Sequence, residues 1–379
     1  MYRNFQKASK HQNLSFLQLE FTLRTSTMAP RQHVRWAKTR QSYRRLWILL
    51  CIASPLLALV GLHAAAAAAL RRVNALGRRC ALEAVEYSGE AAAGIRPRIA
   101  IVSFSEEERV AAGGGVGRRS FRGVMEAVRG NKRAYAERMG YDFFDARRLV
   151  DPSRPPSWSK ILAVRSLLPY YDWVFWNDAD TIITNPDISL ENILNAAIGH
   201  SDFQASPDLV VTEDFNGVNA GVFFFRRSKW SEKFLDTWWN QTSFVRFGST
   251  ISGDNTALKH LISSLPPKEL KNHVRTSPMQ CLFNSYPWLP TWKNAYRLLS
   301  SPLKTWKGAY SNGDFMVHLA GLDEKKKWAD RILDELRAER TIEDLDQGCS
   351  IQSSIGNLAP ICPFTFSNLD FGAYLAKEN

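Results

Sequence analysis

Short apolar runs alternate with longer amphipathic segments from residue 98 onward, and this alternation predicts strands that alternate with helices. The expected strands are Arg98–Phe104, Tyr141–Asp145, Trp173–Trp176, Leu209–Thr212, Gly221–Arg226 and Phe315–Ala320. The expected helices are Arg119–Met139, Trp158–Leu168, Ser189–Ile198, Lys229–Trp239, Asp254–Ser264 and Glu324–Arg340. Such an order favours a mixed α/β sheet with helices on both faces.

The run from Leu46 to Leu70 is apolar and carries no formal charge. A helix needs about 20 apolar residues to cross a bilayer, and this run is long enough. The stronger basic flank lies on its N-terminal side, which places the N-terminus in the cytoplasm and predicts a type II signal anchor. A buried alanine-rich helix and an organelle transit peptide are alternatives, but a transit peptide leaves the long apolar run unexplained.

The anchor divides the chain into five expected parts. They are a basic cytoplasmic tail (1–45), a transmembrane helix (46–70), a stalk (71–96), a catalytic domain (97–340) and a C-terminal extension (341–379). The pairing of the cysteines stays open: Cys349 and Cys362 could close a short loop, and Cys80 could link two chains.

The net charge of +12 is located almost entirely beside the apolar run. Residues 1–45 and 71–79 hold the basic excess, and the remainder is close to neutral. A nucleic-acid-binding protein carries its basic surface on the folded domain. We therefore expect a membrane, and no nucleic acid, as a partner.

The first candidate for chemistry is an Asp-Ala-Asp motif after the apolar strand Trp173–Trp176. If the backbone is extended, Asp178 and Asp180 point to the same side. They would then meet beyond the carboxyl end of a strand, where ligands collect in α/β sheets. Carboxylates suit Mn²⁺ or Mg²⁺, and such an ion neutralises charge on a diphosphate leaving group. Alone, the motif is weak evidence.

Several polar or small residues elsewhere strengthen the motif. Taken singly, each has an ordinary explanation as a surface charge, a helix cap or a core histidine. They are Lys160 before a helix, Asn219 and Gly221 before a strand, Asp254 (the expected N-cap) and Asn255 at a helix start, and His318 and Gly321 at the end of the last strand.

In order and spacing, these features resemble glycosyltransferase family 34 over residues 97–332. That family includes fungal α-1,2-galactosyltransferases and plant xyloglucan xylosyltransferases. The segments that carry the resemblance are Gly130–Tyr135 with Gly140 and Tyr141, Trp158–Lys160, Trp176–Asp180, Asn219–Gly221, Asp254 with Asn255, and His318.

The resemblance implies a GT-A-type nucleotide-diphospho-sugar transferase fold, in which a Rossmann-like mixed sheet is flanked by helices. It implies that Asp178, Asp180 and His318 hold Mn²⁺ (or Mg²⁺) on a UDP-sugar, and that transfer retains the anomeric configuration. Catalytic roles facing the sugar or acceptor are implied for Asp254 and Asn255. Donor contacts are implied for Ser103, near the base, and for Lys160, Asn219, Gly221 and Gly321.

Two departures limit the resemblance. Plant members carry a second acid where this chain has Gly253. They also have Cys and Lys where this chain has Leu322 and Asp323, so the phosphate contact of that lysine would pass to Lys325 or Lys326.

We therefore expect an enzyme of the Golgi membrane that transfers galactose or xylose from a UDP-sugar to a polysaccharide or glycan. A catalytically silent subunit of a Golgi glycosyltransferase complex is the alternative, and association with itself or with other glycosyltransferases stays open. A haloacid-dehalogenase-type phosphatase fits less well, because it needs an aspartate where this chain has Leu258. Asn240 begins a glycosylation sequon whose use the sequence leaves open.

Overall fold

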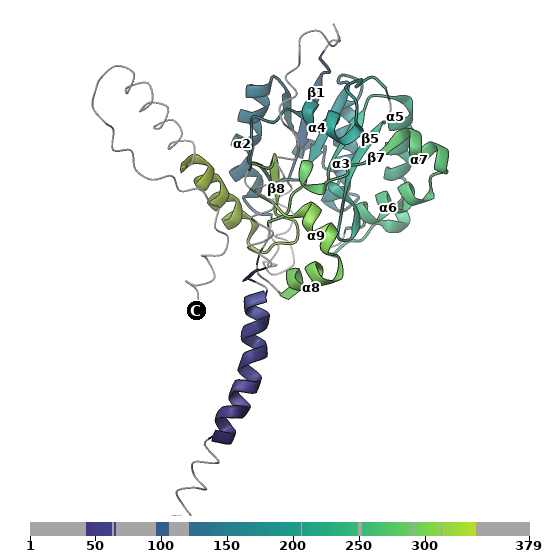
Figure 1. Cartoon of the computed structure of the whole chain (residues 1–379). Coiled ribbons are helices and arrows are strands. Elements are labelled where there is room, and N and C mark those ends of the chain that lie inside the picture. Colours follow the sequence, from purple (N-terminus) through teal and green to yellow (C-terminus); the bar gives the residue numbers. More distant parts are fainter. Residues whose placement is uncertain are drawn as a thin grey trace, which may run out of the picture. The chain divides into compact units, whose positions relative to one another are not determined.

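A computed structural model of the chain separates two units, Met1–Val60 and Gly61–Asn379 (Figure 1). The expected tail, most of the stalk and the C-terminal extension, including Cys80, Cys349 and Cys362, lie outside the described residues. The structure describes residues 43–62, 64–65, 96–105, 121–205, 207–248, 252–287, 289, 292–311 and 313–338.

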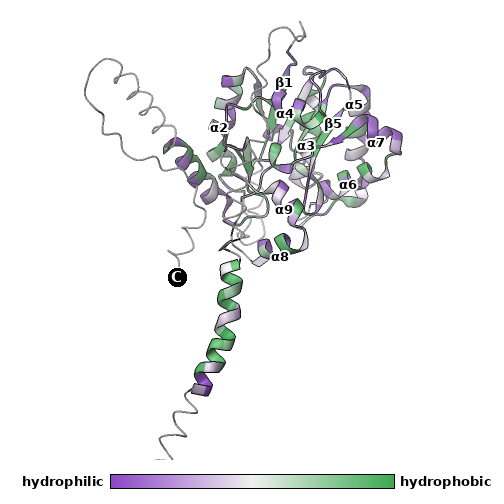
Figure 2. Cartoon of the chain, viewed as in Figure 1, coloured by the Kyte–Doolittle hydropathy of each residue, from purple (hydrophilic) through white to green (hydrophobic). Residues whose placement is uncertain are grey.

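The N-terminal helix Tyr43–Leu62 is long and apolar enough to cross a membrane. Its 20 residues span about 30 Å at 1.5 Å per residue, which matches a bilayer core. Figure 2 shows hydrophobic residues along most of its length, and none of its apolar window is buried. The expected anchor at 46–70 is longer, and residues 66–70 lie outside the described part.

The centre of the second unit is a sheet that, within the described residues, has six strands in the order β2-β1-β3-β6-β5-β7. Strand β1 is parallel to β2 and β3, β6 is antiparallel to β3 and β5, and β5 is parallel to β7. Strands β4 and β8 form a separate antiparallel pair. The strands are β1 (Ile99–Ser103), β2 (Asp142–Asp145), β3 (Trp173–Asn177), β4 (Thr181–Ile183), β5 (Leu209–Asp214), β6 (Gly217–Arg226), β7 (Val274–Thr276) and β8 (Met316–His318).

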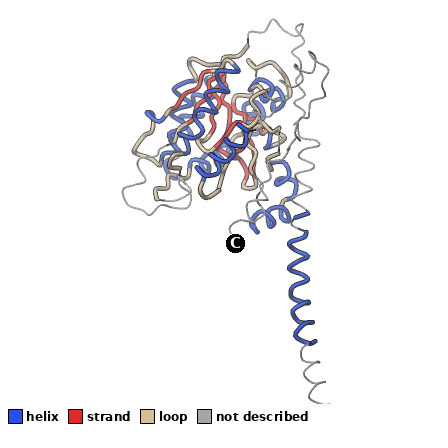
Figure 3. The backbone as a smooth tube through the Cα atoms, turned by 90° about the vertical axis from the view of Figure 1, so that its left-hand side faces the viewer, coloured by secondary structure: helices blue, strands red, loops and turns tan. Residues whose placement is uncertain are grey.

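Helices cover both faces of the sheet, and Figure 3 shows the strands between them. Helices α3, α5 and α6 pack on one face, and α2 and α4 pack on the other. The helices are α2 (Val124–Met139), α3 (Ser159–Leu167), α4 (Leu190–Ile198), α5 (Lys229–Trp239), α6 (Asp254–Ser264), α7 (Pro267–His273), α8 (Trp292–Ser300), α9 (Pro302–Gly308) and a last helix over 325–338. Short 3-10 turns lie at Arg147–Leu149, Pro156–Trp158, Thr242–Phe244 and Gln280–Leu282.

Burial on both faces of the sheet explains why the first four positions of strand β3 are apolar. Successive side chains point to opposite faces, so Trp173 and Phe175 enter one core while Val174 and Trp176 enter the other. Because helices cover both faces, no position of the strand faces water. The expected mixed α/β architecture is therefore confirmed.

Several short elements differ from the sequence expectation. Strands β4 and β7 have three residues each, too few to produce a recognisable period. Helices α7, α8 and α9 were also not predicted, and α2 begins at Val124 rather than at Arg119. Its end is as expected, because Gly140 adopts the left-handed conformation that stops a helix (φ 72°).

Candidate functional site

The two aspartates of the Asp-Ala-Asp motif lie in the connection between β3 and β4. The amide of Thr181 donates to the Asp178 carbonyl at 3.2 Å, so the segment turns. The expectation of an extended backbone here was wrong, since the turn, and not strand alternation, brings the carboxylates together. Asp178, at the end of β3, is anchored by its amide, which donates to the Gly221 carbonyl of β6 at 2.8 Å.

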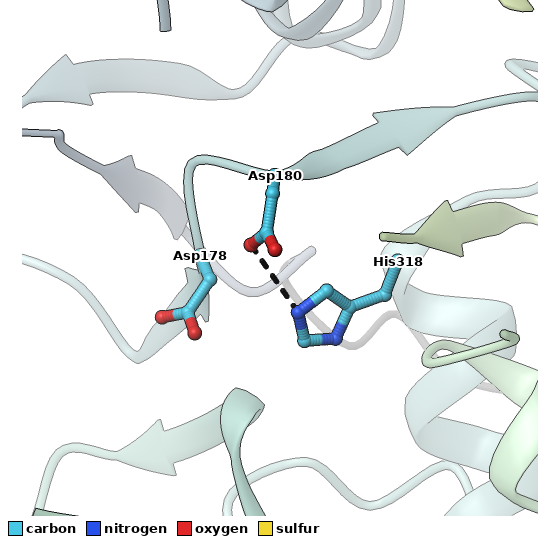
Figure 4. A group of neighbouring side chains, drawn as sticks. All are labelled: Asp178, Asp180 and His318. Carbon is cyan, nitrogen blue, oxygen red and sulfur yellow. Dashed lines mark ion pairs between the residues drawn. The ribbon is translucent and has the colours of Figure 1, made fainter. Parts of the chain in front are cut away.

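His318 reaches the aspartates because β8 pairs with β4. Thr181 lies opposite His318 in this pair, and the amide of Leu319 donates to the Asp180 carbonyl at 2.9 Å. One ligand atom from each of Asp178, Asp180 and His318 lies within 4.8 Å of the others (Figure 4). The structure thus brings together the three predicted metal ligands, from parts of the sequence about 140 residues apart.

The imidazole of His318 is oriented by Asn284. Its Nδ1 lies 2.8 Å from the Asn284 side-chain oxygen. The Asn284 amide nitrogen donates to Thr212 and to Asn219, which leaves the oxygen to accept from His318. His318 Nδ1 therefore donates to Asn284, and Nε2 faces Asp180.

Asp180 is buried, and only one of its two carboxylate oxygens accepts a hydrogen bond. Its Oδ2 accepts from Lys325 Nζ at 2.5 Å, while Oδ1 has no hydrogen-bond donor. That free oxygen lies 3.3 Å from His318 Nε2. Burial alone would raise the pKa of Asp180, but Lys325 and His318 hold this pKa well below its usual range. The carboxylate is therefore ionised.

Gly221 leaves the space between these groups open. A Cβ at this position would lie 2.5 Å from His318 Cε1 and 3.2 Å from Asp178 Oδ2. Any side chain on residue 221 would therefore collide with the cluster. The strand carries glycine here because the backbone passes directly behind the site.

Lys160 connects the aspartate cluster to α6. Its Nζ lies 3.1 Å from Asp178 Oδ1, 3.0 Å from Asp254 Oδ2 and 3.0 Å from the Ala220 carbonyl. Burial alone would lower the pKa of Lys160, but the two carboxylates raise it above its ordinary value. Lys160 is thus a buried, fully charged cation and not a surface charge.

Asp254 was expected to be the N-cap of its helix, and this was wrong. Gly253 is the N-cap, with φ 96°, and Asp254 is the first helical residue. Its carboxylate accepts from Ser252 at 2.6 Å and pairs with Lys160. Burial would raise the pKa of Asp254, yet Lys160 and Ser252 lower it. Asp254 therefore carries the counter-charge of Lys160.

Two expected donor or acceptor residues have their side-chain oxygens hydrogen-bonded to β6. Asn255 accepts from the Ala220 amide at 2.8 Å, and Asn219 accepts from the Gly221 amide at 2.8 Å. Asn219 also donates to Asp214 and to Tyr286. Both asparagines hold the strand that carries Gly221.

Ser103 and Gly321 lie further from the three metal-ligand candidates. The Ser103 hydroxyl, at the end of β1, accepts from Lys132 Nζ at 2.9 Å, and the same Nζ donates to the Asp178 carbonyl at 2.9 Å. Burial lowers the pKa of Lys132 to about 7. Gly321 follows β8 in the left-handed conformation (φ 74°), within a turn in which the Leu322 amide donates to the Leu319 carbonyl at 3.2 Å.

The residues fit a divalent cation. His318 Nε2 and Asp180 Oδ1 face each other at 3.3 Å without a hydrogen bond, and with a neutral imidazole the two atoms would present two ligands to one cation. Oxygen-rich donor sets with one imidazole suit Mn²⁺ or Mg²⁺ better than softer metals. Asp178 is 28% exposed, against 3% for Asp180, so the cluster opens to solvent on the Asp178 side.

Sequence reasoning missed part of the site. Lys132 lies in Gly130–Tyr135, one of the segments that carry the family resemblance, but no role was predicted for it. No sequence pattern indicated Asn284, because an isolated asparagine in a loop-rich segment resembles many others. Lys325 was named only as a substitute for a phosphate-binding lysine, and it instead contacts Asp180.

Comparison with known proteins gives the class. The sequence profile of the galactosyl transferase GMA12/MNN10 family matches residues 96–329. The match covers more than half of the chain, so the chain belongs to this family of glycosyltransferases. Membership and the helix-flanked mixed sheet agree with the expected GT-A-type fold.

The similar proteins are sugar transferases of fungi and plants. The chain is 27% identical to the probable α-1,6-mannosyltransferase MNN10 of Saccharomyces cerevisiae, over 51% of this chain and 50% of that protein. It is 26% identical to an α-1,2-galactosyltransferase of Schizosaccharomyces pombe, over 54% and 57%. It is 27% identical to galactomannan galactosyltransferase 1 of Cyamopsis tetragonoloba, over 35% of each chain. The chain thus spans about half the length, or less, of these relatives.

Solved structures resemble the chain only weakly. The galactosyltransferase LgtC with donor and acceptor analogues has a TM-score of 0.37 at 13% identity, covering 63% of this chain and 95% of that one. A glycosyltransferase involved in glycosylation of the major capsid of PBCV-1 has a TM-score of 0.41 at 13% identity, covering 62% and 100%.

Proposed function

We propose that this chain is a metal-dependent, retaining glycosyltransferase that moves a sugar from a UDP-sugar to a glycan or polysaccharide hydroxyl. One observation carries the proposal. In a chain of this family, Asp178, Asp180 and His318 converge beside a glycine, with one buried carboxylate oxygen of Asp180 left without a hydrogen bond. Galactose is the preferred donor sugar, because relatives from a yeast and a plant are named galactosyltransferases. Xylose is the second choice.

The three ligands would hold Mn²⁺ or Mg²⁺ against the donor diphosphate. Such an ion supplies charge neutralisation for the departing nucleotide diphosphate. The chain's own contribution is positioning: Asn284 fixes the imidazole tautomer, Lys325 leaves Asp180 Oδ1 for the ion, and Gly221 keeps the space open. Lys160 holds Asp178 in place and adds positive charge at the donor side.

Donor and acceptor roles for the remaining residues belong to the same proposal. Asp254 and Asn255 would act at the sugar or acceptor indirectly, a role supported by the contact of Asp254 with Lys160 and of Asn255 with the Ala220 amide of β6. Ser103 and Lys132 would face the nucleotide from β1 and α2, and Asn219 and Gly321 would shape the site margin. We also propose a type II topology in the Golgi membrane, supported by the apolar helix Tyr43–Leu62.

Donor hydrolysis by the full-length chain tests the proposal. Purified protein is incubated with UDP-galactose, UDP-xylose or GDP-mannose and with Mn²⁺, Mg²⁺ or a chelator, and nucleotide diphosphate release is measured. Asp180→Ala should lower metal-stimulated release by at least about 100-fold, because a charged ligand of the ion is lost. Asp187→Ala is the matched control, since Asp187 is an acid with a 70% exposed side chain on the loop after β4.

Release of nucleotide diphosphate by the Asp180→Ala variant at the wild-type rate would refute the metal site.

A second candidate function is a catalytically silent subunit of a glycosyltransferase complex, in which Asp254, already paired with Lys160, would have no catalytic role. Binding of a UDP-sugar without turnover of any donor or acceptor would support that alternative.

A further inference from the structure

An apolar stripe lies exposed on α8 and α9, outside the candidate site. Trp292, Tyr296 and Leu299 are spaced by four and three residues, so they occupy one face of α8, and Leu303 continues the stripe on α9. Their exposed fractions are 71%, 66%, 77% and 65%. Figure 2 shows hydrophobic residues on α8 beside polar ones. Exposed apolar patches of this kind mark interaction surfaces.

The charged residues of α8 and α9 have one sign. Between Glu269 and Asp314 the sequence contains no acidic residue. All charged side chains of α8 and α9 are basic, namely Lys293, Arg297, Lys304 and Lys307, and Arg297 packs on the ring of Phe215. A helix with Trp and Leu on one face and Lys or Arg on the other is typical of segments that lie in a membrane interface. Trp and Tyr favour this zone because their rings are amphipathic.

The chain's own apolar helix makes a membrane the expected partner of the stripe. The helix Tyr43–Leu62 is long and apolar enough to cross one, so the chain would be held at a bilayer. A sugar-binding face would need hydrogen-bonding acids and amides around its aromatic rings. Here two leucines continue the stripe, and acids are absent from the segment. We propose that α8 and α9 form a second, peripheral contact with the bilayer surface, inserting the stripe among lipid headgroups and placing Lys304 and Lys307 on lipid phosphates.

Bromolipid quenching tests this contact in the full-length chain. The protein is reconstituted into two sets of lipid nanodiscs that differ only in bromination of the acyl chains, and tryptophan fluorescence is compared between them. Bromine quenches only tryptophans that reach the lipid. Trp292→Phe should lose part of the wild-type quenching, because one lipid-contacting ring is removed.

The matched control is Trp230→Phe, on α5, where the ring stacks on Phe234 within the protein. This variant should keep wild-type quenching. Leu299→Asp, which retains Trp292 but places an acid on the stripe, should lower quenching as Trp292→Phe does.

Unchanged quenching in both Trp292→Phe and Leu299→Asp would overturn the proposal. So would a chain that does not associate with the nanodiscs. A fluorescence change of Trp292 on titration with a soluble oligosaccharide, without bromolipid quenching, would also overturn it and identify a sugar-binding face. Donor hydrolysis measured on the same variants separates this contact from the proposed function, because neither residue belongs to the candidate site.

Discussion

Gly221→Ala is the sharpest test of the cluster, because it adds a single carbon at its centre. The new Cβ would lie 2.5 Å from His318 Cε1 and 2.8 Å from the Asn219 side-chain oxygen. Carbon atoms in contact are normally about 3.5–4.0 Å apart, so the imidazole must withdraw by about 1 Å. Metal–ligand distances tolerate deviations of only about 0.2 Å. We therefore expect metal binding to weaken by at least about tenfold to 100-fold.

Binding of Mn²⁺ is measured by calorimetry, and thermal unfolding of the same sample checks the fold. Overpacking at this position should cost about 1–3 kcal/mol of unfolding free energy, a loss that a domain of this size can survive. The matched control is Gly130→Ala in α2, where a Cβ meets no atom within 4 Å. In a helix interior that change should stabilise the protein by about 0.5–1 kcal/mol.

The reasoning is refuted if Gly221→Ala folds and binds Mn²⁺ as tightly as the wild type. It is also refuted if Gly130→Ala loses binding to the same extent, because the effect would then not arise at the cluster. Loss of binding in Gly221→Ala alone is the expected result.

Two further changes probe residues that the sequence did not reveal. Asn284→Leu should weaken Mn²⁺ binding by about tenfold to 100-fold, whereas Asn284→Asp should bind Mn²⁺ as the wild type does, because aspartate, unlike leucine, can accept the hydrogen bond from His318 Nδ1. Equal loss of binding in both variants would contradict the orienting role of Asn284. Lys132→Met should flatten the rise of the melting temperature above pH 7. Since the pKa of Lys132 is about 7 in the folded chain and 10.5 ordinarily, the unfolded chain binds more protons between these values, and stability increases with pH there; a variant with the wild-type slope would contradict this.

The parts of the site that were predicted from the sequence are those that follow a local pattern, here the end of an apolar strand. Asp178 and Asp180 follow an apolar strand, and His318 ends another, so strand prediction placed all three at strand ends. These side chains meet only because β4 pairs with β8, and β4 is too short to be predicted from the sequence. The three side chains therefore meet as predicted, but for a reason that was partly wrong, and their role as metal ligands stays a prediction.

Charge partners of the site were not predictable in the same way. Lys325 is separated from Asp180 by 145 residues, and Asn284 is 34 residues from His318. No short-range period connects such pairs, because they meet only after β8 and the helix over 325–338 have packed. The N-cap assignment of Asp254 failed for a related reason: local preference favoured a cap, but the buried ammonium of Lys160 offered a stronger partner.

The balance of charge at the site bears on how its ligands would bind. Three carboxylates, of Asp178, Asp180 and Asp254, face the buried ammonium groups of Lys160 and Lys325. Before any ligand binds, this set carries one net negative charge. A divalent cation alone would turn it into one net positive charge, which is costly in a low-dielectric interior. A nucleotide diphosphate brings compensating negative charge, so the lysines make the donor and the ion mutually dependent. This dependence would favour a closed, loaded site over binding of the free metal, and it arises from lysines that hold the carboxylates in place.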